Sequence, residues 1–290
     1  MGAPKRILIV DDDPDIHRLL KAALESPDRS IDCAADGLAG LRAMESTAYD
    51  LVVTDVNMPG LDGLTLLERV HQLHPETRVV VMTVASTPES VIRAIRERAF
   101  AYFSKPFTVE AIATMAGNAL RAVTPEEDIE VLSALPYWLS LRLRCKLDTA
   151  DRILQFLKEL GAGIPVTERE NIATAFREIL LNAIEHGAGF DPRKSVVLAY
   201  VRTARAVLYY VHDPGPGFSF QNLSHAAVSN QPDAPFQHTE AREQLGMRPG
   251  GFGILMTRHL VDELVYNEAG NEVILIKYLE AGAPATPQAL

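Results

Sequence analysis

Short apolar runs alternate with amphipathic stretches over residues 6–122. The runs RILIV, SIDCAA, YDLVVTD, RVVVMTV and AYFSKP are rich in β-branched residues, which favours strands. The stretches between them, such as DIHRLLKAAL, DGLTLLERV and PESVIRAIRERA, carry apolar residues at helical spacing. Five consecutive strand–helix units predict an α/β fold, a doubly wound parallel sheet of five strands with helices on both faces. In such folds the reactive groups lie at the carboxyl ends of the strands.

The pattern changes after residue 122. Residues 123–137 are acidic and interrupted by prolines, so we interpret them as a linker between two domains, 1–122 and 138–290. LSLRLRCKL then alternates with period two, which predicts a strand, and DRILQFLKEL predicts a helix. Two more strand patterns, SVVLAYVRT and RAVLYYVHD, precede a loop rich in glycine and proline.

The rest of the second domain begins with a long polar segment over residues 219–250, which we expect to form a lid. GILMTRHLVDEL then predicts a helix, and LVYNEAGNEVILIKYL predicts a hairpin. Residues 281–290 are expected to be a disordered tail.

The composition is that of a globular protein, because 47% of the 290 residues are hydrophobic and 23% are charged. The net charge of −10 is shared between both halves without a basic cluster, which argues against nucleic-acid binding. Cys33 and Cys145 form no CxxC or Cys/His cluster, so we expect buried thiols in a reducing compartment. With no apolar run near ~18 residues and no signal peptide, the sequence predicts a cytoplasmic protein without a membrane partner.

Acidic residues, a hydroxyl and a lysine stand at the ends of the predicted parallel strands. An aspartate run from Asp11 to Asp13 ends the first strand, Asp55 the third, Thr83 the fourth and Lys105 the fifth. Carboxylates that share a pocket repel one another unless a cation neutralises them, and hard oxygen ligands suit Mg²⁺. A carboxylate beside that ion can act as a nucleophile on a phosphoryl group, while lysine and hydroxyl stabilise the product oxygens.

Together with the stretch DVNMPGLDG, which begins at Asp55, this arrangement resembles the flavodoxin-like receiver domain of two-component response regulators over residues 6–122. The resemblance implies that a cognate sensor histidine kinase phosphorylates Asp55. It also implies a set of Mg²⁺ ligands: Asp11, Asp12, Asp55 and the backbone carbonyl of Asn57. By the same resemblance, Thr83 is the switch hydroxyl, Lys105 the phosphate contact and Tyr102 the aromatic residue that reorients.

The stretch FREILLNAIEHGAG places polar groups on an otherwise apolar helix, expected over residues 168–186. Its apolar residues recur at spacings of three and four, while Glu178 and Asn182 share another face. Thr167 and Glu170 fit a capping box at the helix start. On this helix alone, an exposed hydrogen-bonding pair is the simpler interpretation of Glu178 and Asn182.

Two later motifs change that interpretation. DPGPG, which begins at Asp213, gives a D-x-G-x-G pattern after a strand. An aspartate there can accept a hydrogen bond from a purine amino group, and the glycines let the backbone approach the ring. GGFG, residues 250–253, runs directly into a helix, whose free N–H groups can bind phosphate oxygens. The order of the three motifs, with a polar segment between the last two, is more specific than any one of them.

That order resembles the GHKL (Bergerat) fold, the α/β sandwich that binds ATP in histidine kinases, gyrase and Hsp90. Within this superfamily, the ExxxNAxxH pattern and the C-terminal motif are similar to the anti-sigma-factor serine/threonine kinases over about 138–280. The resemblance implies that Asn182 binds Mg²⁺ with the ATP phosphates, that Glu178 acts as general base on a substrate hydroxyl, and that Asp213 reads adenine. It assigns four glycines to the pocket and lid: Gly215, Gly217, Gly251 and Gly253.

The favoured hypothesis is a response regulator in which phosphorylation of Asp55 controls an ATP-dependent protein serine/threonine kinase. By resemblance, its partners are an anti-anti-sigma (STAS-like) protein, a sigma factor and a second copy of the chain. One alternative is a nucleotide-gated switch that sequesters a partner without chemistry. Another is an atypical histidine kinase, which needs a phosphoacceptor histidine upstream, whereas the sequence has none between His74 and His186. The role of His186 stays open between the nucleotide motif and a helix cap.

Overall fold

The computed structural model describes residues 4–121, 128–135, 137–218, 243–244 and 251–279. The chain forms two compact units. The first consists of Met1–Glu127 with Gln155–Ala162, and the second of Asp128–Leu154 with Gly163–Leu290. The expected lid over 219–250, apart from residues 243–244, and the expected tail over 281–290 lie outside the described residues.

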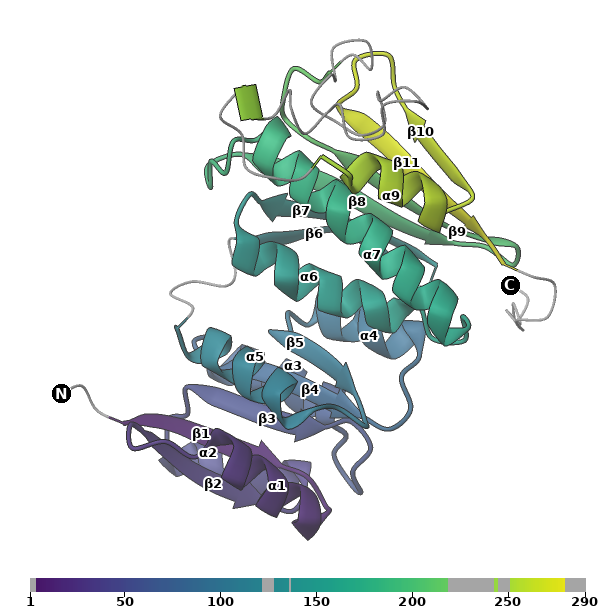
Figure 1. The fold of residues 1–290 in the computed structure, drawn as a ribbon. Helices are drawn as coiled ribbons and strands as arrows, with labels where there is room; N and C mark the ends of the chain where they lie inside the picture. The colour runs from purple at the N-terminus through teal and green to yellow at the C-terminus, as the bar shows by residue number, and fades with distance from the viewer. Residues whose placement is uncertain (1–3, 122–127, 136, 219–242, 245–250, 280–290) are drawn as a thin grey trace. The chain divides into compact units, whose positions relative to one another are not determined.

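The first unit contains a five-stranded parallel sheet in the order β2-β1-β3-β4-β5 (Figure 1). Its strands are β1 (Lys5–Val10), β2 (Arg29–Ala34), β3 (Leu51–Asp55), β4 (Arg78–Thr83) and β5 (Ala101–Ser104). Its helices are α1 (Pro14–Leu24), α2 (Gly37–Ser46), α3 (Gly63–Leu73), α4 (Pro88–Arg96) and α5 (Val109–Arg121). Helix α1 contacts α5, and α3 contacts α2 and α4, so helices cover both sheet faces and the doubly wound fold is confirmed.

Side-chain caps fix the helix starts that follow the strands. Asp13 accepts a hydrogen bond from the Asp15 N–H at the start of α1, and Asp62 accepts one from the Thr65 N–H at the start of α3. Gly63, the first residue of α3, lies against strand β3, because a Cβ built on it would be 1.9 Å from the Asp55 carbonyl oxygen. The loop after Asp55 is therefore held between a strand end and a capped helix.

The second unit contains a six-stranded antiparallel sheet in the order β10-β11-β9-β8-β7-β6. Its strands are β6 (Ile129–Leu135), β7 (Trp138–Arg144), β8 (Ser195–Arg202), β9 (Ala206–His212), β10 (Glu263–Tyr266) and β11 (Glu272–Tyr278). Its helical elements include α7 (Val166–Asn182), the π-helical turn η1 (Ala183–Gly187) and α9 (Gly253–Leu260), and α6 (Leu147–Leu160) begins in it. Side chains of β8 alternate between buried and half-buried, and α7 packs against both α9 and the sheet (Figure 1). The α/β character expected for this part is confirmed.

The segment expected to be a linker over 123–137 contains a strand. Strand β6 pairs antiparallel with β7, with a register shift between Val131 and Ser133. The acidic residues of the segment concealed an alternation in which Ile129 and Val131 are half-buried while Glu130 and Leu132 are exposed. Pairing with β7 therefore outweighs the local composition, and the linker prediction was wrong for residues 129–135.

The long helix of the second unit differs from the prediction at both ends. Helix α7 begins at Val166 with Pro165 in the N-cap position and no side-chain cap, so the capping box of Thr167 and Glu170 was wrong. Proline supplies a suitable backbone angle just before the helix, so the helix starts two residues earlier than the expected Glu168. After Asn182 the chain continues as η1, closed by a hydrogen bond from the Ala188 N–H to the Ala183 carbonyl.

The helix at the C-terminal motif is shorter than expected. Helix α9 ends at Leu260, and strand β10 begins at Glu263, inside the run GILMTRHLVDEL that we predicted to be helical. Pairing of Glu263 with Ile276 of β11 takes the last residues of that run into the sheet. Among the described residues, no helix is long and apolar enough to cross a membrane.

Phe176 of α7 connects the helix layer of the second unit to its sheet. It is 1% exposed, and its ring centroid lies 4.9 Å from that of Tyr209, which in turn lies 5.3 Å from Tyr200. Aromatic pairs at such separations stabilise a core beyond the area that they bury. The same helix carries Glu178 and Asn182, so this packing also sets their position.

We predict that Phe176→Ala destabilises the second unit by about 3–5 kcal/mol, because it leaves a cavity beneath the helix. Val166→Ala, on the same helix but 59% exposed in the wild type, is the control and is expected to change stability by about 0.5 kcal/mol or less. Urea unfolding followed by the fluorescence of Trp138, the single tryptophan, reports on this unit. Equal midpoints for the two variants would contradict the packing role of Phe176.

Candidate functional site

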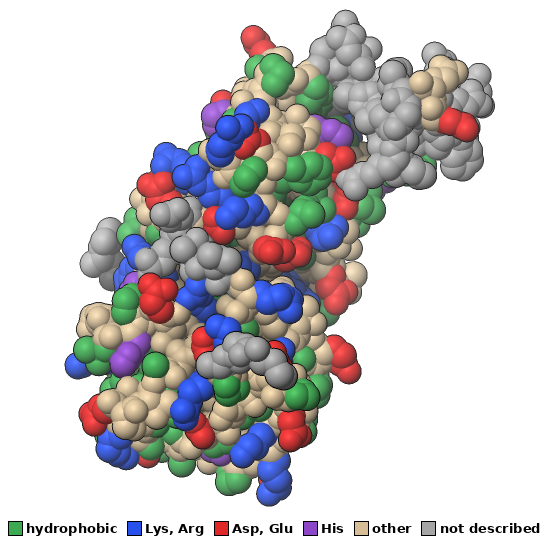
Figure 2. Space-filling view, turned by 90° about the vertical axis from the view of Figure 1, so that its left-hand side faces the viewer, with side chains coloured by type: hydrophobic (Ala, Val, Ile, Leu, Met, Phe, Trp, Pro, Cys, Tyr) green, Lys and Arg blue, Asp and Glu red, His purple; other side chains and the backbone are tan. Residues whose placement is uncertain are grey.

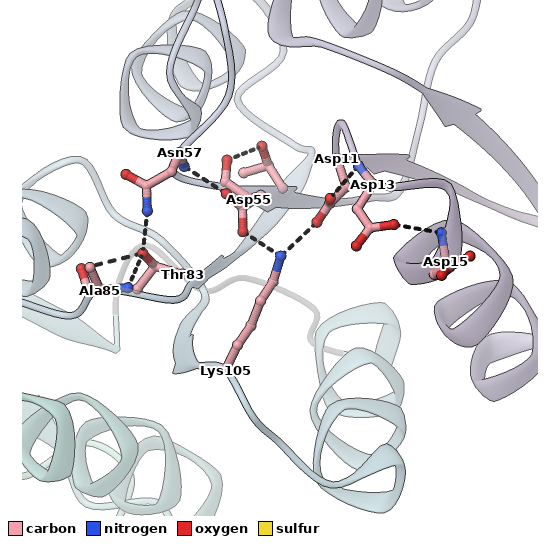
Figure 3. A network of polar contacts seen from close by, with 9 residues as sticks. Asp11, Asp13, Asp15, Asp55, Asn57, Thr83, Ala85 and Lys105 are labelled. Carbon is pink, nitrogen blue, oxygen red and sulfur yellow. Dashed lines mark hydrogen bonds and ion pairs between the residues drawn. The ribbon is translucent and has the colours of Figure 1, made fainter.

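The strand ends of the first unit bring Asp11, Asp55 and Lys105 together (Figure 3). Asp11 follows β1, Asp55 is the last residue of β3, and Lys105 follows β5. The Lys105 Nζ lies 2.9 Å from Asp11 Oδ2 and 2.5 Å from Asp55 Oδ1. Both carboxylates are nearly inaccessible, since Asp11 is 1% and Asp55 3% exposed. Asp11 and Asp55 are 94 and 50 positions from Lys105 in sequence. The fold brings these three side chains into one charged cluster.

Lys105 is the counterion of both buried carboxylates. Burial by itself lowers the pKa of a lysine, but the hydrogen bonds and negative charges of Asp11 and Asp55 outweigh it and raise the pKa of Lys105. The ammonium therefore stays protonated at neutral pH. A phosphoryl group on Asp55 would meet this positive charge directly.

A second set of contacts joins Asp55 to Thr83. The Asn57 N–H donates to Asp55 Oδ2 at 2.6 Å, and the Asn57 side-chain amide donates to Thr83 Oγ1 at 3.0 Å (Figure 3). Thr83 Oγ1 also accepts from the Ala85 N–H at 3.2 Å, in the loop that leads to α4. The hydroxyl predicted to act as a switch therefore connects the Asp55 loop to the next loop along the sheet edge.

Tyr102 and Ser104 lie on β5, the strand that ends at Lys105. Tyr102 is fully buried, and its hydroxyl lies 2.7 Å from Ser90 Oγ of α4. Burial raises the pKa of the Tyr102 hydroxyl, which stays protonated. The Ser104 N–H and hydroxyl both donate to Glu159 Oε1, at 3.4 and 3.1 Å. Glu159 is only 6% exposed and belongs to the segment Gln155–Ala162 of the same unit.

The oxygen donors at this edge fit a magnesium ion. Asp11 and Asp55 supply carboxylates, whereas Asp12 is exposed. Within the described residues, no three Asp, Glu, His or Cys side chains gather closely enough to form a site by themselves. Mg²⁺ takes few protein carboxylates and completes its shell with carbonyl, water and phosphate oxygens. When bound, the ion would neutralise charge that develops on a transferred phosphoryl group.

In the second unit, Glu178 and Asn182 lie one turn apart on α7 and face the start of α9. A Cβ built on Gly253, the first residue of α9, would be 2.8 Å from Glu178 Oε2 and 3.5 Å from Asn182 Nδ2. Thr257 of α9 is fully buried and donates to the Ala175 carbonyl at 3.5 Å, which fixes the two helices together. The first and third sequence motifs therefore meet at a helix N-terminus.

Asp213 follows β9 and lies against the end of η1. Its Oδ1 accepts a hydrogen bond from the Gly215 N–H at 2.8 Å, and a Cβ built on Gly187 would be 2.2 Å from the same oxygen. Burial raises the pKa of the Asp213 carboxyl, and the Gly215 N–H offsets part of that increase. Gly187 is thus part of the site, although it is not among the four glycines that the sequence motifs assigned to it. Its place next to His186 in the ExxxNAxxH pattern was the only sequence signal for it.

The turn between β10 and β11 supports the loop that carries Asp213. Asp213 donates its N–H to the Asn271 carbonyl at 3.0 Å, and Asn271 donates its side-chain amide to the Gly215 carbonyl at 3.4 Å. Gly217 has a φ of +78° and contacts Ala269 of the same turn. Asn271 was also missed, because a supporting asparagine in a hairpin turn has no pattern of its own.

Two further predicted residues lie near this site without contacts that define their role. Gly251 has a φ of +93° two residues before α9. His186 lies within η1 and is exposed, so its role stays open.

Comparison with known proteins also divides the chain in two, although residues 155–162 fall within the second matched region. Residues 7–116 match the family model of the response regulator receiver domain, and residues 143–277 match that of the histidine kinase-like ATPase domain. The chain carries a receiver domain and a histidine kinase-like ATPase domain. Its organisation is therefore that of a response regulator with an ATPase-like output domain.

Curated relatives share part of this organisation. The DNA-binding transcriptional regulator NtrC of Escherichia coli K12 is 32% identical over 114 residues, which cover 39% of this chain and 24% of NtrC. The regulatory protein AtoC of the same organism is 30% identical over 186 residues, which cover 60% of this chain and 40% of AtoC. The chain thus spans less than half the length of either relative.

Among solved structures, the signal receiver domain of an HD domain-containing protein from Pseudomonas fluorescens Pf-5 is 30% identical. It covers 40% of this chain and 94% of its own, with a TM-score of 0.39.

On the face seen in Figure 2, the lysine and arginine side chains of the described residues are interspersed with aspartate and glutamate. This distribution agrees with the net charge of −10.

We predict that acetyl phosphate with Mg²⁺ phosphorylates the wild-type chain and that Asp55→Asn abolishes the label. The Asp55 carboxylate attacks phosphorus and acetate leaves, whereas an amide is no nucleophile. Asp32→Asn is the control, because Asp32 is a partly exposed aspartate on β2 that pairs with Arg6. Phosphate-affinity electrophoresis measures the label, and an Asp55→Asn variant that labels like the wild type would show that the acceptor is elsewhere.

Proposed function

We propose that this protein is a response regulator whose phosphorylation at Asp55 controls an ATP-dependent protein serine/threonine kinase of the anti-sigma type. Its substrate is an anti-anti-sigma (STAS-like) protein, and its phosphate donor at Asp55 is a cognate sensor histidine kinase. A sigma factor is a second binding partner, and the active form is a homodimer. ATP and Mg²⁺ are the cofactors of the ATPase domain.

The observation that carries the proposal is the position of Glu178. Its carboxylate lies against Gly253 at the start of α9, one helical turn from Asn182. A helix N-terminus with free N–H groups suits the phosphates of ATP, and Asn182 beside it suits their metal ion. A carboxylate at the same point is placed to accept a proton where a phosphoryl group is transferred.

Phosphoryl transfer here depends mainly on positioning. Glu178 accepts the proton of a serine or threonine hydroxyl, whose oxygen bonds to the γ-phosphorus as the bond to ADP breaks. Asn182 and the α9 N–H groups hold the phosphates in line with the attacking oxygen. Asp213 holds the adenine end, because its carboxylate accepts a hydrogen bond from the exocyclic amino group.

The histidine kinase alternative lacks its acceptor. The sequence has no histidine between His74 and His186, and the segment that precedes α6 forms strands β6 and β7. Autophosphorylation on an upstream histidine next to the ATPase domain therefore has no support.

The test is transfer of labelled phosphate from ATP to an anti-anti-sigma protein recovered by pull-down with the full-length chain. Glu178→Gln should lower transfer about 10²- to 10⁴-fold while ATP affinity stays unchanged, because the amide cannot accept a proton. Asp213→Asn should instead weaken ATP binding about ten- to hundredfold, since it loses a hydrogen bond to a charged acceptor. Glu170→Gln is the matched control, on an exposed position of the same helix.

Each outcome selects one interpretation. Equal transfer by wild type and Glu178→Gln would show that Glu178 is not the base. If the wild type binds its partner tightly in the presence of ATP but transfers no phosphate, the protein is a sequestering switch and not a kinase. Unchanged ATP affinity in Asp213→Asn would remove the adenine contact.

Contacts within the first unit support control by the receiver domain. Lys105 binds Asp55, and its neighbour Ser104 donates to Glu159. Glu159 lies near the end of α6, a continuous helix whose first residues belong to the second unit. A phosphoryl group on Asp55 that draws Lys105 toward it therefore acts one residue away from a contact with this helix.

We expect this control to be graded. One charge-assisted hydrogen bond contributes about 1.5–3 kcal/mol, which lies within the usual allosteric coupling of about 5- to 150-fold. Inverting a 1:99 population would need about 5.5 kcal/mol. The full-length protein with beryllofluoride, which mimics a phosphoryl group on Asp55, should therefore change transfer rate or partner affinity within that range, and Asp55→Asn should not respond. Identical values with and without beryllofluoride would show that the receiver domain does not regulate the output.

A further inference from the structure

Gly187 occupies an unusual position at the edge of the proposed nucleotide site. A Cβ built on it would lie 2.2 Å from Asp213 Oδ1, 2.3 Å from Asp213 Cγ and 2.5 Å from Asp213 Cβ. All three distances are shorter than any contact that a real side chain tolerates. The Asp213 side chain thus fills the space in which a side chain of residue 187 would lie.

Gly215 closes the other side of this space. A Cβ on Gly215 would lie 2.7 Å from the Gly187 carbonyl oxygen and 2.8 Å from Asp213 Oδ1. The Gly215 N–H donates to that same Oδ1. The carboxylate is therefore held between two glycine backbones, with Oδ1 engaged, and Oδ2 is the oxygen left to accept a hydrogen bond from a ligand.

Asp213 cannot retreat from this position easily. Its backbone N–H donates to the Asn271 carbonyl at 3.0 Å, and the preceding His212 pairs with both Val197 of β8 and Glu272 of β11. The strand end is thus fixed by the sheet. An added methyl group at residue 187 must displace the carboxylate or the end of η1.

The π-helical turn brings Gly187 to this point. Helix α7 keeps α-helical bonding as far as Asn182, and the Ala188 N–H then bonds to the Ala183 carbonyl five residues earlier. π-helical turns are rare and occur mostly at functional sites. Here the turn separates Glu178 and Asn182, on the α-helical part, from Gly187, which faces Asp213.

We propose that Gly187 is a positioning residue for adenine recognition, and that the π-helical turn exists to hold its bare backbone against the Asp213 carboxylate. The proposal deepens the proposed function and rests on it, because it assumes that Asp213 reads the adenine amino group. Gly187 touches no substrate. It acts by fixing which oxygen of Asp213 faces the base.

The first test compares nucleotides that differ at one group. Calorimetry on the full-length protein measures affinity for ADP and for inosine diphosphate, which carries an oxo group in place of the amino group. Wild type should prefer ADP, and Gly187→Ala should bind ADP at least about tenfold more weakly while losing that preference. A general loss of structure would weaken both nucleotides equally and keep the preference.

Gly189→Ala is the matched control. It adds the same methyl group two residues later, where nothing lies within 4 Å of it. Because Gly189 has a φ of +67°, the variant strains the backbone without touching Asp213, so stability should fall while the preference for ADP persists. A preference retained by Gly187→Ala overturns the proposal.

A double-mutant cycle tests the contact without a ligand. Asp213→Gly empties the space beside residue 187, so Gly187→Ala should lower the Tm of the wild type but hardly that of Asp213→Gly. An equal loss of Tm in both backgrounds overturns the contact. If the wild type binds no ADP, the proposed function fails, and the role of Gly187 in recognition fails with it. If the wild type binds ADP with a preference that Gly187→Ala keeps, only the present proposal fails.

Discussion

Two carboxylates buried at one edge of a sheet can both stay charged only if a cation lies between them. In the receiver domain that cation is Lys105, which contacts Asp11 and Asp55 from the end of a third strand. The strands that carry these residues are adjacent or nearly so only because the parallel sheet has the order β2-β1-β3-β4-β5. The fold therefore brings two acidic side chains together, and Lys105 offsets the repulsion between them. Asp55, the proposed phosphoacceptor, is thus kept almost out of water and next to a positive charge.

In the ATPase domain, acidic side chains lie close to backbone atoms. Gly187 and Gly215 lack the atoms that would keep the Asp213 carboxylate at a distance, and Gly253 does the same for Glu178. Gly63 of the receiver domain plays the same part beside the Asp55 carbonyl. In all these places a missing side chain sets the position of an acidic group or of its backbone. The receiver site thus combines a shared cation with one such glycine, whereas close approach to glycine backbone recurs at both acidic groups of the ATPase domain.

The sequence was sufficient where structure follows local pattern. Apolar runs and strand ends predicted the receiver domain and placed Asp55, Thr83 and Lys105 at one edge, because parallel strands leave their carboxyl ends together. The sequence did not predict features that depend on contacts between residues far apart in the chain. Strand β6 forms because β7 pairs with it, although it follows an acidic, proline-containing stretch and its own residues are half-buried or exposed. The π-helical turn brings Gly187 against Asp213, 26 positions later in the chain, and no helical periodicity contains that information. The capping box failed for a smaller reason, since Pro165 competes for the helix start.

A π-helical turn amounts to one residue more than an α-helix needs over the same length. Successive residues of an α-helix are about 100° apart, so losing one residue between Ala183 and Gly187 would rotate all that follows by that angle. Glu178 and Asn182 precede the turn and would keep their place at α9, whereas Gly187 would leave Asp213. On the proposed function, length variation of a single codon would thus separate base selectivity from phosphate chemistry. A lineage of such domains could then change which nucleotide it reads, or stop reading the base, while the proposed transfer site is inherited intact.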